Sequence, residues 1–350
     1  MNLYDLGHVP WLDSQLIYHA LPRVGEEGLI LLAPAEPYVC IGFFQDARQE
    51  VDLDLCRARG IPVFRREVGG GAVYLDGQQL FYQLVLHRDN PAAQGDKATL
   101  YRRLLEPVAE TYRQLGVEAM YRPVNDVVTA EGRKIAGTGA AEIEDSVILV
   151  GNIIFDFDYK TMTEILRVPD EKYRDKVFKS MQENLTTLRR ELGQTPDWGH
   201  VINLLRANYE KILGPLTPAA LSQAVRDKVN ELRQTHTTEE WLLGQQRPSG
   251  EGRRVKISSS ASVVRNLYKA PGGLIRATLE LSDEHIKAIE LSGDFFFYPS
   301  DSVALLENEL AGRPLAQVPD IVRRFYADEK PESPGVTPED VIAAILGPAR

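Results

Sequence analysis

Residues 62–86 read PVFRREVGGGAVYLDGQQLFYQLVL and contain three short runs that are typical of β-strands. These runs, at 62–64, 72–75 and 80–86, are rich in β-branched and aromatic side chains and are bounded by glycine-containing turns. No helical pattern separates one run from the next, so neighbouring strands are expected to pair with each other. This favours an α+β fold with a mixed or antiparallel sheet over a doubly wound parallel sheet.

The same alternation of short strands and helical patterns continues on both sides of this stretch. The helix expected at 100–115 is expected to end at Gly116, and Pro107 either kinks it or marks its start. Further strands are expected at 29–32, 38–42, 124–129 and 147–155, and further helices at 12–21, 161–167, 170–192, 200–212, 218–234 and 239–245.

The polar stretch 244–254, GQQRPSGEGRR, indicates a linker because it is rich in glycine, proline and charge. We therefore expect a first domain at 1–245, a linker at 246–254 and a small α+β domain at 255–350. Four adjacent aromatic residues at 295–298 predict a strand buried on both faces or an interdomain contact, and core packing explains them better than a ligand cage. In the second domain, strands are expected at 255–258, 274–281, 285–292 and 295–298, and helices at 302–310, 319–326 and 338–346.

Composition narrows the class of protein. Of 350 residues, 43% are hydrophobic and 26% charged, as in ordinary globular proteins, and the formal net charge is −10. That charge argues against a general binder of nucleic acid or of anionic membranes. Cys40 and Cys56 are too few for a disulfide framework or a four-cysteine zinc site. With no signal-peptide pattern and no apolar run of about 20 residues, a cytoplasmic protein is expected.

The glycine-rich turn that follows Arg66 is the first candidate for chemistry. Gly69, Gly70 and Gly71 let the backbone approach a ligand closely, and successive N–H groups there can bind an anion. Arg66 can add a bidentate contact to phosphate or carboxylate. The turn is not a P-loop, because no Gly-Lys-Ser/Thr ends it, and Tyr74 replaces the last glycine of a dinucleotide-binding fingerprint. A purely structural hairpin is equally compatible with it.

A second candidate lies at Asn125-Asp126 and at Lys134 in the stretch GRKIAGTG. A carboxylate inside an apolar strand needs a partner or a metal, although an Asx turn would also satisfy it. Spacing alone favours an exposed hairpin lysine at Lys134 over one that contacts phosphate or carboxylate. No histidine pair at i, i+4 and no G-x-S-x-G motif supports zinc or serine-hydrolase chemistry.

Taken together, these motifs resemble the lipoate–protein ligase family, which belongs with biotin–protein ligases and octanoyltransferases. The segment 65–76, RREVGGGAVYLD, is similar to the family's arginine and triple-glycine motif, and Asn125-Asp126 with 132–137, GRKIAG, is similar to its second motif. The resemblance covers residues 1–245. Residues 255–350 are similar to the carboxyl-terminal accessory domain of these ligases.

The resemblance implies an ATP-dependent ligase that activates lipoate or octanoate as acyl-AMP and transfers the acyl group to a lysine of a carrier. It implies ATP, Mg²⁺ and lipoate as cofactors and substrate, with Lys134 catalytic and Asp126 holding Mg²⁺. The carrier would be a lipoyl domain protein, such as the E2 of a 2-oxoacid dehydrogenase or the glycine cleavage H protein. Because the net charge is negative, a local basic segment would have to attract an acidic carrier, and we expect it at 172–179 and 189–190. The substrate or adenylate would contact Arg66, Gly69, Gly70, Gly71, Ala72, Val73, Asn125, Gly137 and Thr138.

Two alternatives stay open: an ATP-independent octanoyl or lipoyl transferase, and a non-catalytic protein that binds lipoyl carriers. Cysteine-dependent transferases of this group keep their nucleophile near or after the lysine hairpin, whereas both cysteines here precede the glycine-rich turn. Four positions depart from the family pattern, because Val68, Leu75, Gln79 and Val150 stand where Ser, His, Asn and His are common.

Overall fold

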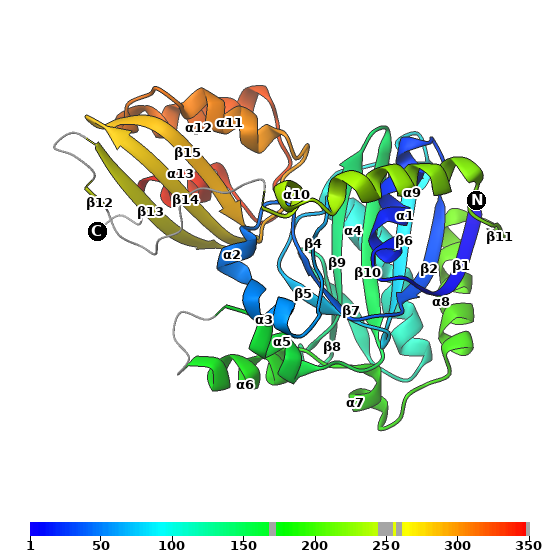
Figure 1. Ribbon diagram of the computed structural model, residues 1–350. Coiled ribbons are helices and arrows are strands. Elements are labelled where there is room, and N and C mark those ends of the chain that lie inside the picture. The colour runs from blue at the N-terminus through cyan, green and yellow to red at the C-terminus, as the bar shows by residue number, and fades with distance from the viewer. Residues whose placement is uncertain (168–172, 244–254, 257–260, 348–350) are drawn as a thin grey trace. The chain divides into compact units, whose positions relative to one another are not determined.

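The computed structural model describes residues 1–167, 173–243, 255–256 and 261–347 (Figure 1). The chain divides into two compact units. The first comprises 1–40, 51–67 and 73–242, and the second comprises 41–50, 68–72 and 243–350. The linker expected at 246–254 lies outside the described residues, and the domain limits stay a prediction.

A large mixed sheet forms the centre of the first unit. Its eight strands follow the order β11-β1-β2-β6-β10-β9-β8-β7. Strand β1 runs parallel to β2 and β11, and the other neighbours are antiparallel. The expected α+β class with a mixed sheet is confirmed. The strands are β1 (Asn2–Val9), β2 (Gly28–Pro34), β6 (Gln79–His87), β7 (Ala119–Arg122), β8 (Asp126–Thr129), β9 (Lys134–Ile143), β10 (Ser146–Ile154) and β11 (Thr217–Pro218).

A three-stranded sheet carries the glycine-rich turn. Strand β3 (Tyr38–Ile41) lies between β4 (Val63–Arg65) and β5 (Val73–Leu75), in the order β4-β3-β5. The turn at 66–72 therefore connects the two outer strands of this sheet. The three strands expected within residues 62–86 are present, but the expected pairing of neighbours is wrong, because β4 and β5 both pair with β3 and β6 pairs with β2 and β10.

Helices of the first unit pack on the sheet and on each other. Helix α1 contacts β6 and α9, and Figure 1 shows α1 and α9 side by side. Helix α4 begins at Lys97 because the Asp96 side chain accepts a hydrogen bond from Thr99 N, so Pro107 lies inside the helix and does not mark its start. The helices are α1 (Asp13–Arg23), α3 (Leu53–Ala58), α4 (Lys97–Gln114), α5 (Tyr159–Ile165), α6 (Arg174–Asn184), α7 (Leu188–Leu192), α8 (Trp198–Leu213), α9 (Gln223–His236) and α10 (Glu239–Leu243), with a 3₁₀ turn at Pro91–Ala93.

The single helix expected at 170–192 is wrong. Residues 168–172 lie outside the described part, and the remainder forms two helices, α6 and α7. The break occurs because Leu185 bridges Lys134 of β9 and Thr186 N donates to Lys134 O at 2.8 Å. The helix expected at 218–234 starts late for a related reason, since Thr217–Pro218 pairs with β1 and Ser222 caps α9.

An antiparallel sheet forms the second unit, in the order β12-β13-β14-β15. Side chains of β14 alternate between buried and half-buried, and Ile275 and Leu279 belong to one core with Phe325. The residues at 295–298 do not form the expected strand. They are a buried loop after Gly293, and Phe295 stacks on Phe44 with ring centres 4.9 Å apart, so core packing is confirmed. The elements are β12 (Val255–Lys256), β13 (Ala261–Ala270), β14 (Gly273–Ser282), β15 (His285–Gly293), α2 (Ala47–Glu50), α11 (Ser302–Leu310), α12 (Val318–Asp328) and α13 (Pro338–Leu346), with a 3₁₀ turn at Leu315–Gln317.

Within the described residues, every helix is too short or too polar to span a bilayer.

Candidate functional site

The glycine-rich turn is held by close backbone contacts within the second unit. Phe43 N donates to Val68 O at 3.0 Å, and Gly70 N donates to Phe295 O at 3.2 Å. A Cβ atom on Gly42 would overlap Gly70 O, and one on Gly69 would lie 2.7 Å from Phe295 O. Packing therefore excludes a side chain at positions 42 and 69.

Gly70 and Gly71 differ in what they require. Gly70 has a φ of +91°, which L-residues rarely adopt. A Cβ on Gly71 would meet nothing closer than Asp294 Cβ at 3.7 Å. Packing explains Gly42 and Gly69 and backbone conformation explains Gly70, whereas Gly71 has room for a side chain. At the end of the turn, Ala72 is half-buried and Val73 is exposed.

The two adjacent arginines before the turn have different surroundings. Arg65 is buried, and its guanidinium donates to the carbonyl oxygens of Trp241 and Leu242. Arg66 is half-buried, and its Nη1 donates to Cys40 O at 3.3 Å. Arg65 is therefore a structural residue, and Arg66 is the arginine of this pair that retains partial exposure.

Asp126 and Lys134 form an ion pair across the antiparallel strands β8 and β9. Lys134 Nζ lies 2.6 Å from Asp126 Oδ1, and the other carboxylate oxygen lies 3.1 Å from Arg122 Nη2. Asp126 is opposite Gly137 in the register, where a Cβ would lie 3.1 Å from Lys134 Cε. Gly137 thus leaves space for the lysine side chain to reach the carboxylate. Lys134 is therefore not a free hairpin lysine: its side chain is 37% exposed, but its ammonium is paired with Asp126.

Asn125 and Thr138 form a second cross-strand link beside this ion pair. Asn125 Nδ2 donates to Thr138 O, and Thr138 Oγ1 donates to Asn125 O. An Asx turn does not describe Asn125, since its side chain bonds to the opposite strand. A Cβ on Gly151 of β10 would overlap the Tyr82 hydroxyl and Thr138 Cγ2. Sequence reasoning did not identify Tyr82 or Arg122.

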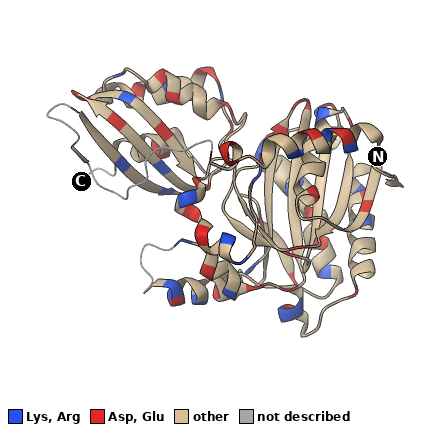
Figure 2. Cartoon of the chain, viewed as in Figure 1, with Lys and Arg blue, Asp and Glu red and all other residues tan. Residues whose placement is uncertain are grey.

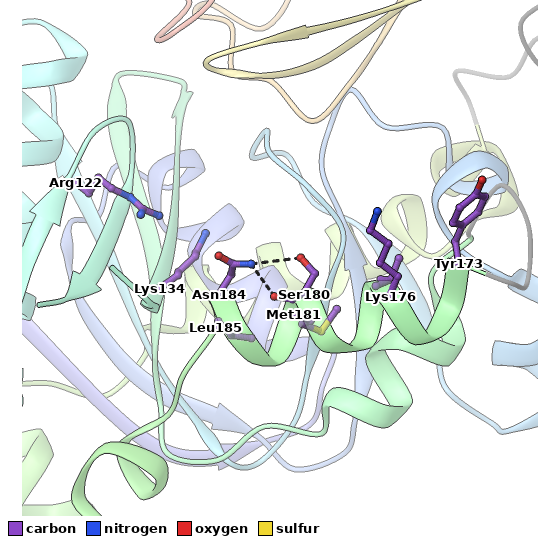
Figure 3. A pocket seen from close by; sticks show the side chains of 9 residues that line it. Arg122, Lys134, Tyr173, Lys176, Ser180, Met181, Asn184 and Leu185 are labelled. Atoms are coloured by element: carbon purple, nitrogen blue, oxygen red, sulfur yellow. Dashed lines mark hydrogen bonds between the residues drawn. The ribbon is translucent and has the colours of Figure 1, made fainter. Parts of the chain in front are cut away.

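A pocket of about 610 Å³ opens between the β7–β9 strands and helix α6 (Figure 3). Arg122 and Lys134 enter it from the strands, and α6 supplies a third cation, Lys176, together with apolar side chains. No Asp or Glu lines it among the described residues. Such a lining suits an anion that carries an apolar group. The lining residues are Arg122, Lys134, Tyr173, Lys176, Val177, Ser180, Met181, Asn184 and Leu185.

The residues that were expected to act together belong to both units of the chain. Lys134 lines it, and Asp126, Gly137, Asn125 and Thr138 lie beside Lys134 on β8 and β9 or immediately before β8. The turn at 68–72 belongs to the second unit.

The segment expected to attract a carrier takes part in other contacts. Lys172 lies outside the described residues, and Lys176 lines the pocket. Arg189 pairs with Asp156 at 2.8 Å, and Arg190 donates to the carbonyl oxygens of Gln182 and Leu185. Figure 2 shows basic and acidic residues together along α6. Carrier docking at 172–179 and 189–190 stays a prediction.

Neither cysteine is activated. Burial raises the pKa of Cys40 in β3, and it raises the pKa of Cys56 in α3 to about 11. A nucleophilic cysteine needs a lowered pKa and access to the substrate. Both thiols therefore act as buried apolar groups, as expected from the sequence.

The four departures from the family pattern are accommodated by packing. Val68 and Leu75 are buried, and Val150 of β10 is half-buried. Gln79 Nε2 donates to Tyr74 O at 3.2 Å, and its Oε1 accepts from Asn152 Nδ2 at 2.6 Å.

Residues 12–210, more than half of the chain, match the lipoyl protein ligase A/B catalytic domain. The chain belongs to this family. Lipoate-protein ligase A subunit 1 of Thermoplasma acidophilum is 29% identical over 242 residues, which cover 66% of this chain and 90% of that protein. Octanoyltransferase LipM of Kyrpidia tusciae is 27% identical over 227 residues, covering 59% and 82%. Subunit 2 of the T. acidophilum ligase is 47% identical over 78 residues, covering 22% and 82%.

Solved structures of family members share the fold. A structure of the bi-partite T. acidophilum ligase and its E2 lipoyl domain aligns with a TM-score of 0.62 and 28% identity, covering 71% of this chain and 98% of that one. Lipoate-protein ligase A bound with ATP aligns with a TM-score of 0.59 and 25% identity, covering 69% and 98%. The resemblance inferred from the motifs is confirmed, and the chain is an enzyme of the lipoate ligase and octanoyltransferase family.

A glycine comparison tests the packing of the turn. Gly42→Ala is expected to lower the free energy of unfolding by about 1–3 kcal/mol, because the new methyl group meets the Gly70 carbonyl. Gly71→Ala, the matched control, is expected to change it by less than about 0.5 kcal/mol. Urea unfolding measures both, and equal losses would contradict the packing described above.

Proposed function

We propose that the chain is an ATP-dependent lipoate–protein ligase. It would activate lipoate or octanoate as acyl-AMP and transfer the acyl group to a lysine of a lipoyl carrier domain. The observation that carries this proposal is that one chain is similar to both subunits of a two-subunit ligase. By comparison, the match to octanoyltransferase LipM covers 82% of that protein and 59% of this chain.

The state of the cysteines supports a ligase over a cysteine-dependent transferase. The chain has two cysteines, and each is buried with a raised pKa. In a ligase the lysine of the carrier attacks the acyl-adenylate directly, so that no protein nucleophile is required. The absence of an activated thiol is compatible with that route and opposes the other.

Lys134 is the residue to which we assign the electrostatic work. In the first step a carboxylate oxygen of the acid attacks the α-phosphorus of ATP, and pyrophosphate leaves. In the second step the carrier amine attacks the acyl carbonyl, and AMP leaves. Negative charge develops on phosphate or acyl oxygens in both steps, and an ammonium held at the pocket stabilises it. We assign Arg66, with Gly69, Gly70, Gly71, Ala72 and Val73, to the carboxyl and α-phosphate end, and Asn125, Gly137 and Thr138 to the adenylate.

Asp126 fits a positioning role better than a metal ligand. Its two oxygens lie 2.6 Å from Lys134 Nζ and 3.1 Å from Arg122 Nη2, so a metal ion would have to displace a cation. Because both oxygens are paired with cations, we assign Asp126 to the orientation of Lys134 rather than to Mg²⁺.

The function is tested by supplying each route with its own acyl donor. The protein is incubated with lipoate, ATP, Mg²⁺ and a lipoyl carrier domain, or with an octanoyl carrier protein and no ATP. Pyrophosphate release and a carrier mass increased by one lipoyl group are expected in the first mixture. The Cys40→Ala/Cys56→Ala variant is expected to retain this activity within about threefold. Modification from the octanoyl donor alone would establish a transferase, and no modification in either mixture would favour a binding protein.

Removal of the Lys134 ammonium is expected to slow adenylate formation more than tenfold, or about 1.4 kcal/mol of transition-state stabilisation. Lys134→Ala is measured by lipoate-dependent exchange of pyrophosphate into ATP. Lys228→Ala is the control, because Lys228 also forms an ion pair in the first unit, with Glu231. Activity of Lys134→Ala within tenfold of the parent would contradict the assignment of charge stabilisation to Lys134.

The role of Asp126 is separated from metal binding by a Mg²⁺ titration. Asp126→Asn is expected to lower kcat about tenfold without changing the Mg²⁺ concentration for half-maximal activity, because the amide still fills the site but orients Lys134 poorly. A half-maximal concentration raised several-fold, with activity restored at high Mg²⁺, would instead identify Asp126 as a metal ligand.

A further inference from the structure

A buried cluster of charged and polar groups lies in the first unit, outside the pocket that Lys134 lines. It consists of His19 and Arg23 on α1, Glu67 after β4, and His236 on α9, and is called the Glu67 cluster below. Glu67 Oε1 lies 2.7 Å from His236 Nε2 and 3.9 Å from His19 Nδ1. Glu67 Oε2 lies 2.9 Å from Arg23 Nη2.

The protons of this cluster can be assigned from its hydrogen bonds. His19 Nε2 accepts from the backbone N–H of Glu67 at 3.4 Å, so a neutral His19 carries its proton on Nδ1, which faces the carboxylate. Burial lowers the pKa of His19 to about 3, and the ring is therefore neutral at pH 7. Burial alone would raise the pKa of Glu67, but the two histidines and Arg23 lower it to about 2.

The hydrogen bonds of the cluster favour a buried carboxylate with its counter-charges over a set of metal ligands, although His19 Nδ1 has no hydrogen-bond partner at 3.9 Å from Glu67 Oε1. His19, Glu67 and His236 are close enough to hold a metal ion, and they form the one such group among the described residues. A metal on His19 would need a bare Nδ1, and the proton would move to Nε2 to face the Glu67 N–H. The ionised Glu67 already has Arg23 and His236 as partners.

The cluster holds the backbone on both sides of Arg66. Glu67 is fixed by α1 and α9, as described above. Arg65 donates to the carbonyl oxygens of Trp241 and Leu242 in α10, and Trp241 Nε1 donates to Arg65 O at 2.8 Å. The Trp241 ring packs on His236 with centres 4.1 Å apart. Residues of three helices thus contact residues 65 and 67. The backbone conformation of Arg66, which lies between them, is therefore restricted.

We propose that the Glu67 cluster is a positioning site that sets the direction of the Arg66 side chain for the acyl carboxylate or phosphate. The role of Arg66 toward the substrate rests on the function proposed above, whereas the anchoring of residues 65–67 is independent of it. The Arg66 guanidinium binds an anion well only if it is already oriented toward it. A more mobile backbone at Arg66 would therefore weaken substrate binding more than it slows the chemical step. The cluster residues contact Glu67 and its neighbours, so they act through Arg66.

The experiment compares Glu67→Gln and His236→Gln with Arg233→Gln. Arg233 on α9 pairs with Asp13 on α1, so its loss also weakens the α1–α9 contact but leaves the Glu67 cluster intact. For the two cluster variants, the KM for lipoate in pyrophosphate exchange is expected to rise about tenfold while kcat changes less than threefold. Arg233→Gln is expected to keep both values within about twofold of the parent.

Hydrogen exchange provides a readout that needs no enzymatic activity. Amides in a peptide covering residues 63–67 are expected to exchange faster in both cluster variants, with β6 and β10 unchanged, and to match the parent in Arg233→Gln. Unchanged exchange and unchanged KM in a protein that only melts earlier would overturn the proposal. One metal ion per purified chain, lost in His236→Gln, would also overturn it. If the parent forms no adenylate, the proposed ligase function fails, and the exchange comparison alone decides whether the cluster anchors residues 65–67.

Discussion

The partly buried carboxylate of Asp126 is the constraint on which the candidate site depends. A charge removed from water needs a counter-charge, and Asp126 obtains two, from Lys134 and Arg122. The antiparallel register of β8 and β9 places Lys134 within reach, and Gly137 leaves room for its side chain. The same interaction that stabilises Asp126 therefore holds an ammonium at the wall of the pocket.

Missing side chains shape the site as much as charged ones. The backbone at 42 and 69 approaches other backbone too closely for a Cβ, and Gly151 makes room for Tyr82 and Thr138. These contacts carry an entropic cost, because glycine loses more conformational freedom on folding than any other residue. By contrast, residues 65–67 are held by side chains from α1, α9 and α10. Residues 65–69 are thus fixed in two ways, by side-chain contacts at 65–67 and by close backbone packing at 69.

Much of the fold follows from local pattern, because burial repeats with the period of each element. Residues 80–86 and 147–155 predicted β6 and β10, and 100–115 predicted most of α4. Strand β9, KIAGTGAAEI, was missed since its small residues carry little strand signal. The break between α6 and α7 was missed because its cause is Lys134, far away in sequence. In the same way, apolar aromatics at 295–298 predict burial but not which element they form.

The sequence by itself determined the α+β class, the family motifs, the negative net charge and the scarcity of cysteine, all of which are local or additive properties. Tertiary structure alone decided which of two adjacent arginines is buried, and that Lys134 is paired with Asp126. It also joined Glu67 to His236, 169 positions apart. Contacts of this kind depend on how strands and helices pack, and no spacing rule within a single sequence encodes which distant side chains will meet.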